Sequence, residues 1–219
     1  MQVLQKKAAD MGIDLDECQI NAFQVYMETL LSWNRRMNLT AITDPNQIIV
    51  KHFEDSLTLL RFLPHDKPLR LIDAGTGAGF PGVPLAIAAP LLSVTLMDSL
   101  RKRLTFLDEI IKILDLKNAV TVHSRLEDAG KVNEHRGQYE AVVSRAVARM
   151  SVLAGYCLPL TAPGGYFYAM KGPAGREEAL DAKDIINKFG GRIERFEDVS
   201  LFDGAANEQM RRTIVIITK

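Results

Sequence analysis

Hydrophobic residues in the first third of the chain recur every three or four positions, the spacing that places them on one face of a helix. One such segment runs to about Met37, where residues 38–40 break the pattern. A second begins after Asp44, whose side chain can cap a helix that has Pro45 at its first position. The two apolar faces consist of Ile20, Phe23, Met27, Leu30 and Leu31 in the first helix and Ile49, Phe53, Leu57 and Leu60 in the second, expected over residues 46–62.

From residue 69 onward, short apolar runs alternate with helical patterns, as repeated strand–helix–strand units require. We expect strands over residues 69–72, 93–97, 119–123, 140–144, 165–170, 192–199 and 212–218, and helices over residues 83–89, 100–115, 150–158 and 176–189. The helix over residues 100–115 should bury a stripe made of Leu100, Leu104, Leu107, Ile111 and Leu114. The alternation predicts an α/β protein whose sheet is flanked by helices.

The junction between the first predicted strand and its helix carries the strongest chemical signal. Residues 69–82 read LRLIDAGTGAGFPG: an apolar run, an acid at Asp73, three glycines at alternate positions, and Pro81-Gly82 at the start of a helix. Glycines let a backbone turn sharply and approach a ligand closely, and a helix N-terminus supplies free N–H groups. A strand, a glycine loop and a helix start in this order form the nucleotide-cofactor cradle of an α/β sheet.

Two classes of cofactor use such a loop, and the acidic residues discriminate between them. The loop fits the dinucleotide pattern G-x-G-x-x-G, and Asp98 follows about twenty residues later, at a strand end where it can bind ribose hydroxyls in either class. Asp73, however, would repel a pyrophosphate at the helix N-terminus. It suits the ammonium group of S-adenosylmethionine, which carries no phosphate. The pattern resembles motifs I and II of the class I methyltransferases.

The last two predicted strands favour the same fold. No helical pattern separates them, so they should form a hairpin that places an antiparallel strand at or near one edge of the sheet. A pure dinucleotide-binding fold would carry a helical crossover there. We therefore expect the Rossmann-like, mixed seven-stranded sheet of a class I S-adenosylmethionine-dependent methyltransferase, flanked by helices. Residues 68–219 would form this domain, and residues 1–67 a helical extension packed on its core.

Polar residues also follow the other parallel strands, at the sheet edge where ligands bind. The third strand leads to residues 124–127, whose backbone can lie against an adenine; the fourth ends in Ser144-Arg145-Ala146, and the fifth in Lys171-Gly172-Pro173. Arg145 is a poor general base because its guanidinium stays protonated, but it can hold a carboxylate, a phosphate or a guanine edge. A nucleophile that needs no deprotonation, such as guanine N7, would match this site and leave catalysis to alignment and exclusion of water.

The composition constrains the partners and the compartment. Lys+Arg and Asp+Glu both total 27 among 219 residues, so no global charge demands a nucleic acid. Arg35-Arg36, Arg101-Lys102-Arg103 and Arg211-Arg212 form local basic clusters, which an RNA partner and a solvated surface explain equally well. The cysteines, Cys18 and Cys157, and the four histidines show no metal-ligand spacing, and both thiols should be buried in a reducing cytosol. With no membrane span or signal peptide in the pattern, we expect a cytoplasmic monomer without metal.

Several short motifs together resemble the GidB/RsmG family, which methylates guanine N7 in bacterial small-subunit ribosomal RNA. They are Trp33-Asn34 with residues 38–41, the segment HFEDSL at 52–57, the glycine loop, Asp98-Ser99 with Lys102-Arg103, and Ser144-Arg145-Ala146. The similarity covers nearly the whole chain. It implies S-adenosyl-L-methionine as cofactor and 16S ribosomal RNA or the small subunit as partner, with guanine 527 as the acceptor.

The resemblance places Gly75, Phe80, Leu126, Glu127 and Arg145 on the family's cofactor contacts, and Lys171-Gly172 also fits its pattern. The candidate cofactor-binding residues are Asp73, Gly75, Thr76, Gly77, Gly79, Phe80, Asp98, Leu126, Glu127 and Arg145, and the candidate catalytic residues are Arg145 and Lys171. For Arg145 the cofactor carboxylate is the favoured partner, and the guanine edge or a phosphate is the alternative. Two other functions stay open: an NAD-dependent oxidoreductase, and a non-catalytic module that binds RNA or the ribosome.

Overall fold

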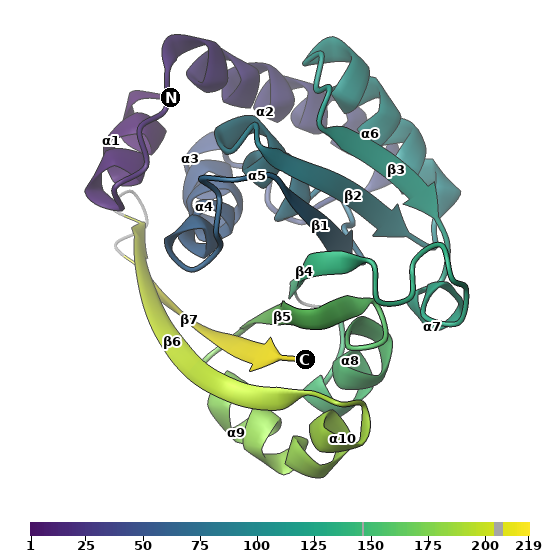
Figure 1. Ribbon diagram of the computed structural model, residues 1–219. Coiled ribbons are helices and arrows are strands. Elements are labelled where there is room, and N and C mark those ends of the chain that lie inside the picture. Colours follow the sequence, from purple (N-terminus) through teal and green to yellow (C-terminus); the bar gives the residue numbers. More distant parts are fainter. Residues whose placement is uncertain (146, 204–207) are drawn as a thin grey trace.

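The sheet has the strand order β3-β2-β1-β4-β5-β7-β6 in the computed structural model, which describes residues 1–145, 147–203 and 208–219 (Figure 1). The strands are β1 (Leu69–Ala74), β2 (Leu92–Asp98), β3 (Ala119–His123), β4 (Tyr139–Arg145), β5 (Thr161–Lys171), β6 (Arg192–Asp203) and β7 (Glu208–Thr218). The first five strands pair in parallel, whereas β7 is antiparallel to both β5 and β6. The seven predicted strands and the antiparallel edge hairpin are confirmed.

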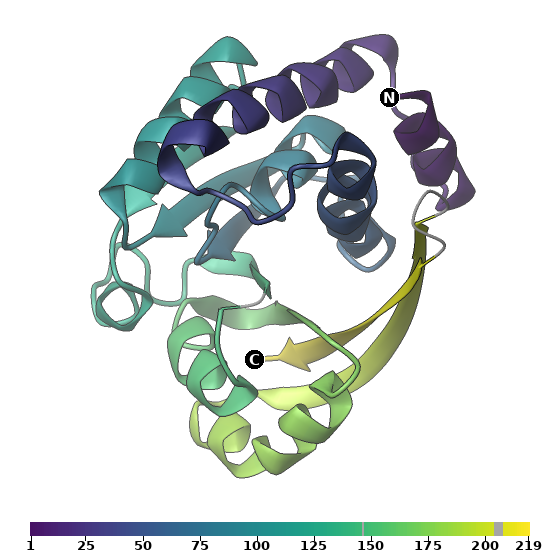
Figure 2. The same ribbon diagram turned by 180° about the vertical axis from the view of Figure 1, so that it is seen from behind.

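The first face of the sheet is covered by α5 (Gly82–Ala88), α6 (Arg101–Ile113) and α2 (Glu17–Met37). Figure 2 shows α2 running beside α6, and the ring of Trp33 on α2 lies 5.6 Å from that of Phe106 on α6. Because α6 packs against α2 as well as against β2 and β3, its buried residues are Leu104, Phe106, Leu107 and Ile110. The predicted stripe was therefore wrong in part: Leu100 is 42% exposed.

The second face is covered by α7 (Leu126–Ala129), α8 (Met150–Cys157), α9 (Gly175–Asp181) and α10 (Lys183–Lys188). Residues that alternate along the strands divide between the two faces, as in any strand whose side chains point to opposite sides. Leu71 and Ile216 belong to the core on the first face, and Ile72 and Val215 to the core on the second. The helix expected over residues 176–189 is two helices that meet at Ala182, and the sequence pattern does not predict α7.

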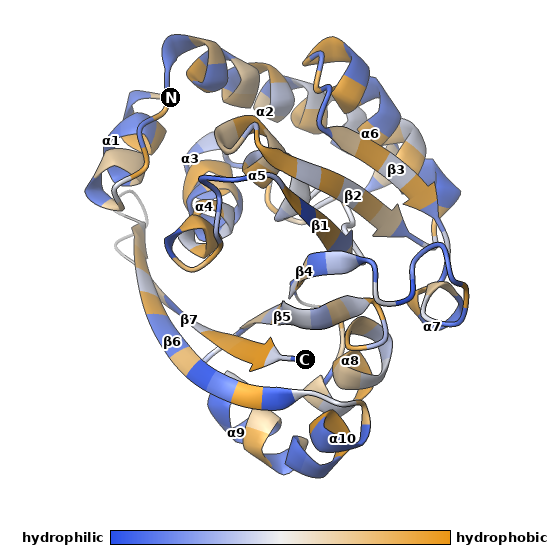
Figure 3. Ribbon diagram, viewed as in Figure 1, coloured by the Kyte–Doolittle hydropathy of each residue, from blue (hydrophilic) through white to orange (hydrophobic). Residues whose placement is uncertain are grey.

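Hydropathy follows the same layering in Figure 3. Strand β2 and the C-terminal part of β7 are mostly orange, as expected for strands between two helical layers. Strand β6, at the edge of the sheet, alternates between orange and blue, and its Val199 and Leu201 are buried while Ser200 and Phe202 are exposed. Within the described residues, no helix is long and apolar enough to cross a membrane.

The N-terminal region consists of α1 (Gln2–Asp10), α2, α3 (Pro45–Ile48), the π-helix η1 (Ile49–Glu54), α4 (Asp55–Leu57) and the 3-10 helix η2 (Thr58–Arg61). The helix expected over residues 46–62 is thus continuous but changes its winding along its length. All four residues of its predicted apolar face are buried, and they join the core on the first face of the sheet. A division of the chain at residues 67 and 68 stays a prediction.

The ends of α2 are fixed by local hydrogen bonds. The Asp16 side chain accepts a hydrogen bond from the Gln19 backbone, whose side chain reaches back to Asp16 N, a capping box that begins the helix. Asn38 ends the helix in the left-handed conformation, with φ at 48°. The chain then turns inward, so Leu39 and Thr40 reach the cavity described below. Cys18 lies near the start of α2 and is exposed, contrary to expectation, whereas Cys157 is buried.

Candidate cofactor and substrate site

The glycine loop after β1 is organised around a buried carboxylate. Asp73 Oδ2 accepts hydrogen bonds from the Thr76 hydroxyl at 2.7 Å and from Gly82 N at 2.8 Å, which ties the loop to the start of α5. The other oxygen, Oδ1, is buried and has no hydrogen-bond partner among the described residues. Burial raises the pKa of Asp73 to about 6. The acid predicted to meet an ammonium group therefore holds the loop with one oxygen and keeps the other unpaired.

Two glycines of the loop, Gly77 and Gly79, are required for different reasons. Gly77 has φ at +62°, and a Cβ built there would meet no atom within 4 Å, so its backbone opens on free space. Gly79 has φ at +101°, and a Cβ there would lie 2.6 Å from the Tyr26 hydroxyl and 2.8 Å from a Leu107 methyl carbon. Gly77 can thus face a ligand, whereas Gly79 is required by the close approach of α2 and α6 to the loop.

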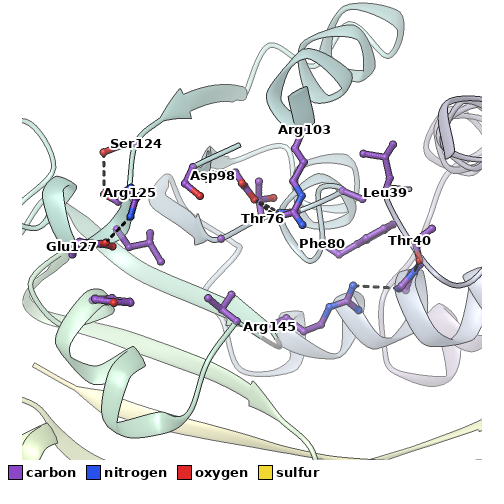
Figure 4. Close-up of a pocket in the computed structure, with 18 residues that line it drawn as sticks. Leu39, Thr40, Thr76, Phe80, Asp98, Arg103, Ser124, Arg125, Glu127 and Arg145 are labelled. Atoms are coloured by element: carbon purple, nitrogen blue, oxygen red, sulfur yellow. Dashed lines mark hydrogen bonds and ion pairs between the residues drawn. The ribbon is translucent and has the colours of Figure 1, made fainter. Parts of the chain in front are cut away.

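A cavity of about 500 Å³ lies at the carboxyl ends of β1 to β4, within the size range of small-molecule sites (Figure 4). Its lining comes from five segments: Leu39, Thr40 and His52 from the N-terminal region; Gly75, Thr76, Gly77, Ala78 and Phe80 from the glycine loop; Asp98, Ser99 and Arg103 after β2; Ser124, Arg125, Leu126 and Glu127 after β3; and Arg145, Val147 and Tyr156 after β4. Eight of the eleven residues predicted from the sequence line this cavity. Asp73, Gly79 and Lys171 are not part of the described lining.

Asp98 is held rigidly at the end of β2. Its Oδ2 accepts from Gly77 N at 3.0 Å and from Arg103 Nη1 at 3.1 Å, and its Oδ1 accepts from Leu100 N at 2.8 Å. In Figure 4, Arg103 reaches down from α6 to this carboxylate. The acid therefore has a fixed orientation before any ligand binds, a condition for selective recognition of two neighbouring hydroxyls.

The turn after β3 forms the opposite end of the cavity from Phe80 and Thr40 (Figure 4). Leu126 begins α7 and is 8% exposed, so it offers an apolar surface beside the exposed backbone of the turn. Glu127 lies next to it, with its carboxylate 3.7 Å from the Arg125 guanidinium. An apolar side chain next to polar main chain suits a planar heterocycle with polar edges.

Arg145, at the end of β4, pairs with a residue for which the sequence pattern predicts no role. Its Nη1 lies 2.8 Å from Asp55 Oδ2 and 3.1 Å from the Lys51 carbonyl oxygen, and its guanidinium carbon lies 5.1 Å from the Phe80 ring centroid. The side chain lines the cavity, but its charged partner in the structure is Asp55 of the N-terminal region. A contact with a cofactor carboxylate stays a prediction.

His52 forms the wall of the cavity beside Arg145. Its Nε2 lies 2.9 Å from the Thr40 hydroxyl, and its Nδ1 lies 3.1 Å from the Lys51 carbonyl and 3.3 Å from Arg145 Nη2. Burial, reinforced by the positive charge of Arg145, lowers the pKa of His52 to about 3. The imidazole is therefore neutral at physiological pH, and both of its nitrogens have neighbours within the protein.

Lys171 lies on the second face of the sheet. Its ammonium group donates to the Ala148 carbonyl at 2.8 Å and pairs with Glu178 Oε2 at 2.7 Å. These contacts tie β5 to α9 and to the segment before α8. The structure gives Lys171 a stabilising role, and its predicted catalytic role gains no geometric support.

Basic residues border the cavity on the α6 side. Arg103 and Arg125 line it, and Arg101 and Lys102 in the first turn of α6 are exposed next to Arg103. Arg35 and Arg36 are exposed in the last turn of α2, a few residues before the cavity-lining Leu39. The third predicted cluster divides: Arg211 is exposed, whereas Arg212 Nε donates to the buried Asp55 at 3.0 Å.

Sequence comparison gives a consistent result over most of the chain. Residues 19–200 match the family model GidB, described as rRNA small subunit methyltransferase G. A ribosomal RNA small subunit methyltransferase G from Desulforamulus reducens is 48% identical over 190 residues, which cover 87% of this chain and 79% of the relative. Its counterpart from Pelotomaculum thermopropionicum is 45% identical over 219 residues, which cover 100% of this chain and 90% of the relative.

Comparison with solved structures identifies the fold. A SAM-dependent methyltransferase from Aquifex aeolicus aligns with a TM-score of 0.57 at 19% identity, covering 83% of this chain and 97% of that one. The M. jannaschii protein TYW2, solved in complex with AdoMet, aligns with a TM-score of 0.55 at 16% identity, covering 70% of each chain. The mixed seven-stranded sheet is therefore of the Rossmann-like class I methyltransferase type predicted from the sequence.

Proposed function

The chain belongs to the GidB family of rRNA small subunit methyltransferases, and we propose that it transfers a methyl group from S-adenosyl-L-methionine to N7 of a guanine in bacterial 16S ribosomal RNA. The acceptor position, guanine 527, rests on the resemblance of the sequence motifs to that family. The structural support comes from the cavity at the carboxyl ends of β1 to β4, which supplies a cofactor cradle and, among its described residues, has no free general base beside Phe80, His52 and Arg145.

The residues of the cavity fit S-adenosylmethionine. Gly77 opens its backbone on free space where a side chain would occupy the cradle, and Asp98 presents a preoriented carboxylate to ribose hydroxyls. Leu126 and the neighbouring backbone would hold the adenine, and Gly75 the methionine part. The start of α5 already donates Gly82 N to the Asp73 carboxylate, which leaves this helix N-terminus unsuited to a pyrophosphate and disfavours the dinucleotide alternative. When bound, the cofactor supplies an electrophilic methyl group on a sulfonium centre.

The protonation state of the site favours an acceptor whose lone pair is free at neutral pH. His52 is neutral, but its Nε2 contacts the Thr40 hydroxyl, and its Nδ1 contacts the Lys51 carbonyl oxygen and Arg145 Nη2. Asp98 is occupied by three donors, and Arg145 cannot accept a proton. Guanine N7 needs no base, whereas an exocyclic amine is usually assisted by a nearby acceptor. Glu127 is the remaining carboxylate of the described lining, and it lies near Arg125 at the end of the cavity opposite Phe80 and Thr40 (Figure 4). The absence of a free base beside Phe80, His52 and Arg145 among the described lining residues is the observation that carries the N7 assignment.

The residues that line the cavity would therefore act by alignment. Asp98, Gly77 and Leu126 would fix the cofactor. Phe80, His52 and Arg145 would form the wall against which the acceptor base is positioned. Effective alignment of two reactants accounts for roughly 7–11 kcal/mol of barrier lowering in favourable cases, so no proton-transfer step is needed for a large rate enhancement.

The charge around the cavity suits an RNA partner. Arg101 and Lys102 occupy the first turn of α6, where the helix dipole disfavours cations, and they lie beside the mouth formed by Arg103. Arg35 and Arg36 extend this basic border along α2. A phosphate backbone would compensate the unfavourable position, so we propose that ribosomal RNA lies across the ends of α2 and α6. We further propose that the protein works in the cytoplasm as a monomer and without metal.

Mapping of N7-methylguanosine in 16S ribosomal RNA from cells with and without the gene tests the proposal. We expect one N7-methylguanosine, at guanine 527, to disappear with the gene and to be restored by the purified protein with S-adenosylmethionine and undermethylated small subunits. A methyl group on another atom or another RNA would overturn the assignment. Calorimetry with S-adenosylhomocysteine and with NAD separates the oxidoreductase alternative, and cofactor binding without any methylation would favour the non-catalytic module.

A further inference from the structure

Asp55 is a fully buried carboxylate between two arginines from β4 and β7, the strands on either side of β5. Its Oδ2 lies 2.8 Å from Arg145 Nη1 at the end of β4, and its Oδ1 lies 3.0 Å from Arg212 Nε on β7. Asp55 itself begins α4 in the N-terminal region and is 0% exposed. One side chain therefore joins three regions of the fold through charge-assisted hydrogen bonds.

The N-terminal region holds both terminal nitrogens of Arg145. Nη1 is shared by Asp55 and the Lys51 carbonyl oxygen, and Nη2 lies 3.3 Å from His52 Nδ1. The guanidinium also lies over the Phe80 ring, and the same ring stacks on His52. Within the described part of the chain, Nε of Arg145 has no acceptor. Three of the five guanidinium N–H groups thus face the N-terminal region, and the side chain also lines the cavity.

The charges make the position of Arg145 depend on Asp55 more than on its other neighbours. The Lys51 carbonyl and the neutral His52 offer dipoles, whereas Asp55 offers the only full negative charge within hydrogen-bond distance of Arg145 among the described residues. Loss of that charge would leave two guanidinium groups, those of Arg145 and Arg212, facing each other across a neutral side chain. Arg145 would then reorient toward solvent, which at this place means into the cavity.

We propose that Asp55 is a positioning residue for methyl transfer: it holds Arg145 in the cavity wall and, through Arg145, fixes the Phe80–His52 pair beside the cofactor and acceptor base. The inference rests on the proposed function, because it assigns Asp55 a part in the same reaction. Asp55 is not part of the described cavity lining, so it acts through Arg145.

The first test is the kinetics of Asp55→Asn, which keeps the shape of the side chain and removes its charge. We expect kcat to fall by about 100-fold, the effect of a misplacement of roughly 1 Å at a reacting centre. The KM for the small ribosomal subunit should stay unchanged, because Asp55 is buried and takes no part in the basic border. Glu140→Gln is the matched control: it removes the carboxylate partner of Arg70 on the same sheet, outside the cavity lining, and should leave kcat unchanged.

A double-mutant cycle separates positioning from general loss of stability. Arg145→Gln should lower kcat, and adding Asp55→Asn to it should lower kcat no further, since Asp55 acts only through Arg145. In the double variant only the Arg212 guanidinium lacks its carboxylate partner, against two guanidinium groups in Asp55→Asn alone, so the double variant is the less destabilised of the two and can be measured where Asp55→Asn alone does not fold. Arg212→Gln breaks the other half of the bridge and should reduce the unfolding temperature with little change in kcat.

Three results would overturn the inference: wild-type kcat for a folded Asp55→Asn protein, multiplicative effects in the double variant, or an Arg212→Gln protein as impaired in kcat as Asp55→Asn. Failure of the proposed function looks different, because then the wild-type protein itself forms no N7-methylguanosine. In that case the same double-mutant cycle is measured with the dissociation constant for S-adenosylhomocysteine in place of kcat, and the effects of the two substitutions are still expected to be non-additive.

Discussion

The imidazole of His52 stacks on the ring of Phe80, with the ring centroids 4.4 Å apart and the planes inclined by 20°. His52 belongs to the π-helix η1 of the N-terminal region, and Phe80 belongs to the glycine loop that follows β1. The two residues therefore close one cavity from two parts of the chain. The N-terminal region is a component of the site, beyond covering one face of the sheet.

The pKa of His52 predicts a loss of stability in mild acid. Since it lies at about 3 in the folded protein and at the ordinary value of 6.5 in the unfolded chain, the unfolded chain binds one more proton between these values. The free energy of unfolding should therefore fall by up to about 1.4 kcal/mol per pH unit as the pH drops through this window. Urea unfolding from about pH 7 to about pH 5 measures the slope. His52→Gln should reduce it, and substitution of the exposed His65 should not.

Asp73 should contribute with the opposite sign. Its folded pKa of about 6 exceeds its ordinary value of 3.8, so its contribution to stability is present below 3.8 and is lost as the pH rises through about 6. Asp73→Asn should abolish this contribution and should be as stable as the wild type near neutral pH, because an amide oxygen can still accept from Thr76 and Gly82. Asp73→Ala should cost about 1–3 kcal/mol, since both donors lose their acceptor. A strongly destabilised Asn variant would show instead that the charge itself is required.

Asp98→Ala should weaken the binding of S-adenosylmethionine. Loss of charge-assisted hydrogen bonds to the ribose should cost about 1.5–3 kcal/mol, which isothermal titration calorimetry resolves. Asp98→Asn should lie between the wild type and Ala, because it keeps an acceptor for Gly77 N or Leu100 N. Asp108→Asn, which changes an exposed acid on α6, is the control. Equal affinities in a correctly folded Asp98→Ala protein would remove Asp98 from the cofactor site.

The basic turn of α6 should bind RNA. Replacement of Arg101 and Lys102 by Ala should weaken binding to ribosomal RNA and reduce the slope of log K against log salt by about two, because each cation neutralises one phosphate. Affinity for the cofactor should not change. Lys183→Ala with Lys188→Ala is the matched pair, because it removes two cations from α10, in the helical layer on the second face of the sheet (Figure 1). Equal RNA binding by both double variants would show that the turn of α6 is only a solvated surface.

The sequence predicts the sheet and the cofactor cradle because both depend on local signals. An apolar run followed by an acid and alternate glycines determines where β1 ends, and the spacing to Asp98 determines the next strand end. The alternation of strands and helices, with a hairpin at the end, then restricts the topology to a mostly parallel sheet with an antiparallel strand at or near one edge. For the same reason the apolar face of the helix over residues 46–62 was predicted correctly, although its change to π and 3-10 winding was not.

The partners of Arg145 could not be predicted, because ion pairs between distant segments leave no local pattern. Asp55 stands between Glu54 and Ser56 in a helical segment, and nothing in its spacing indicates that β4 and β7 both bring an arginine to it. His52 stands out in the sequence only as part of a family motif, and its role depends on the ring of Phe80. The partial error in the α6 stripe has a similar cause, since α2 covers a second side of that helix.

The bridge from Asp55 to Arg212 also determines when the site is fully stabilised during synthesis. The two residues are separated by 157 positions, and β7 is made after every other strand of the sheet. Chains emerge from the ribosome at about 5–20 residues per second and fold from the N-terminal side first. The glycine loop and the N-terminal region can therefore meet while the carboxylate between them still lacks one of its two arginines. A nascent chain that ends before β7 carries the cofactor cradle and the Asp55–Arg145 pair but not the second arginine that stabilises them, so the growing polypeptide should gain the full stability of its site only with its last strand.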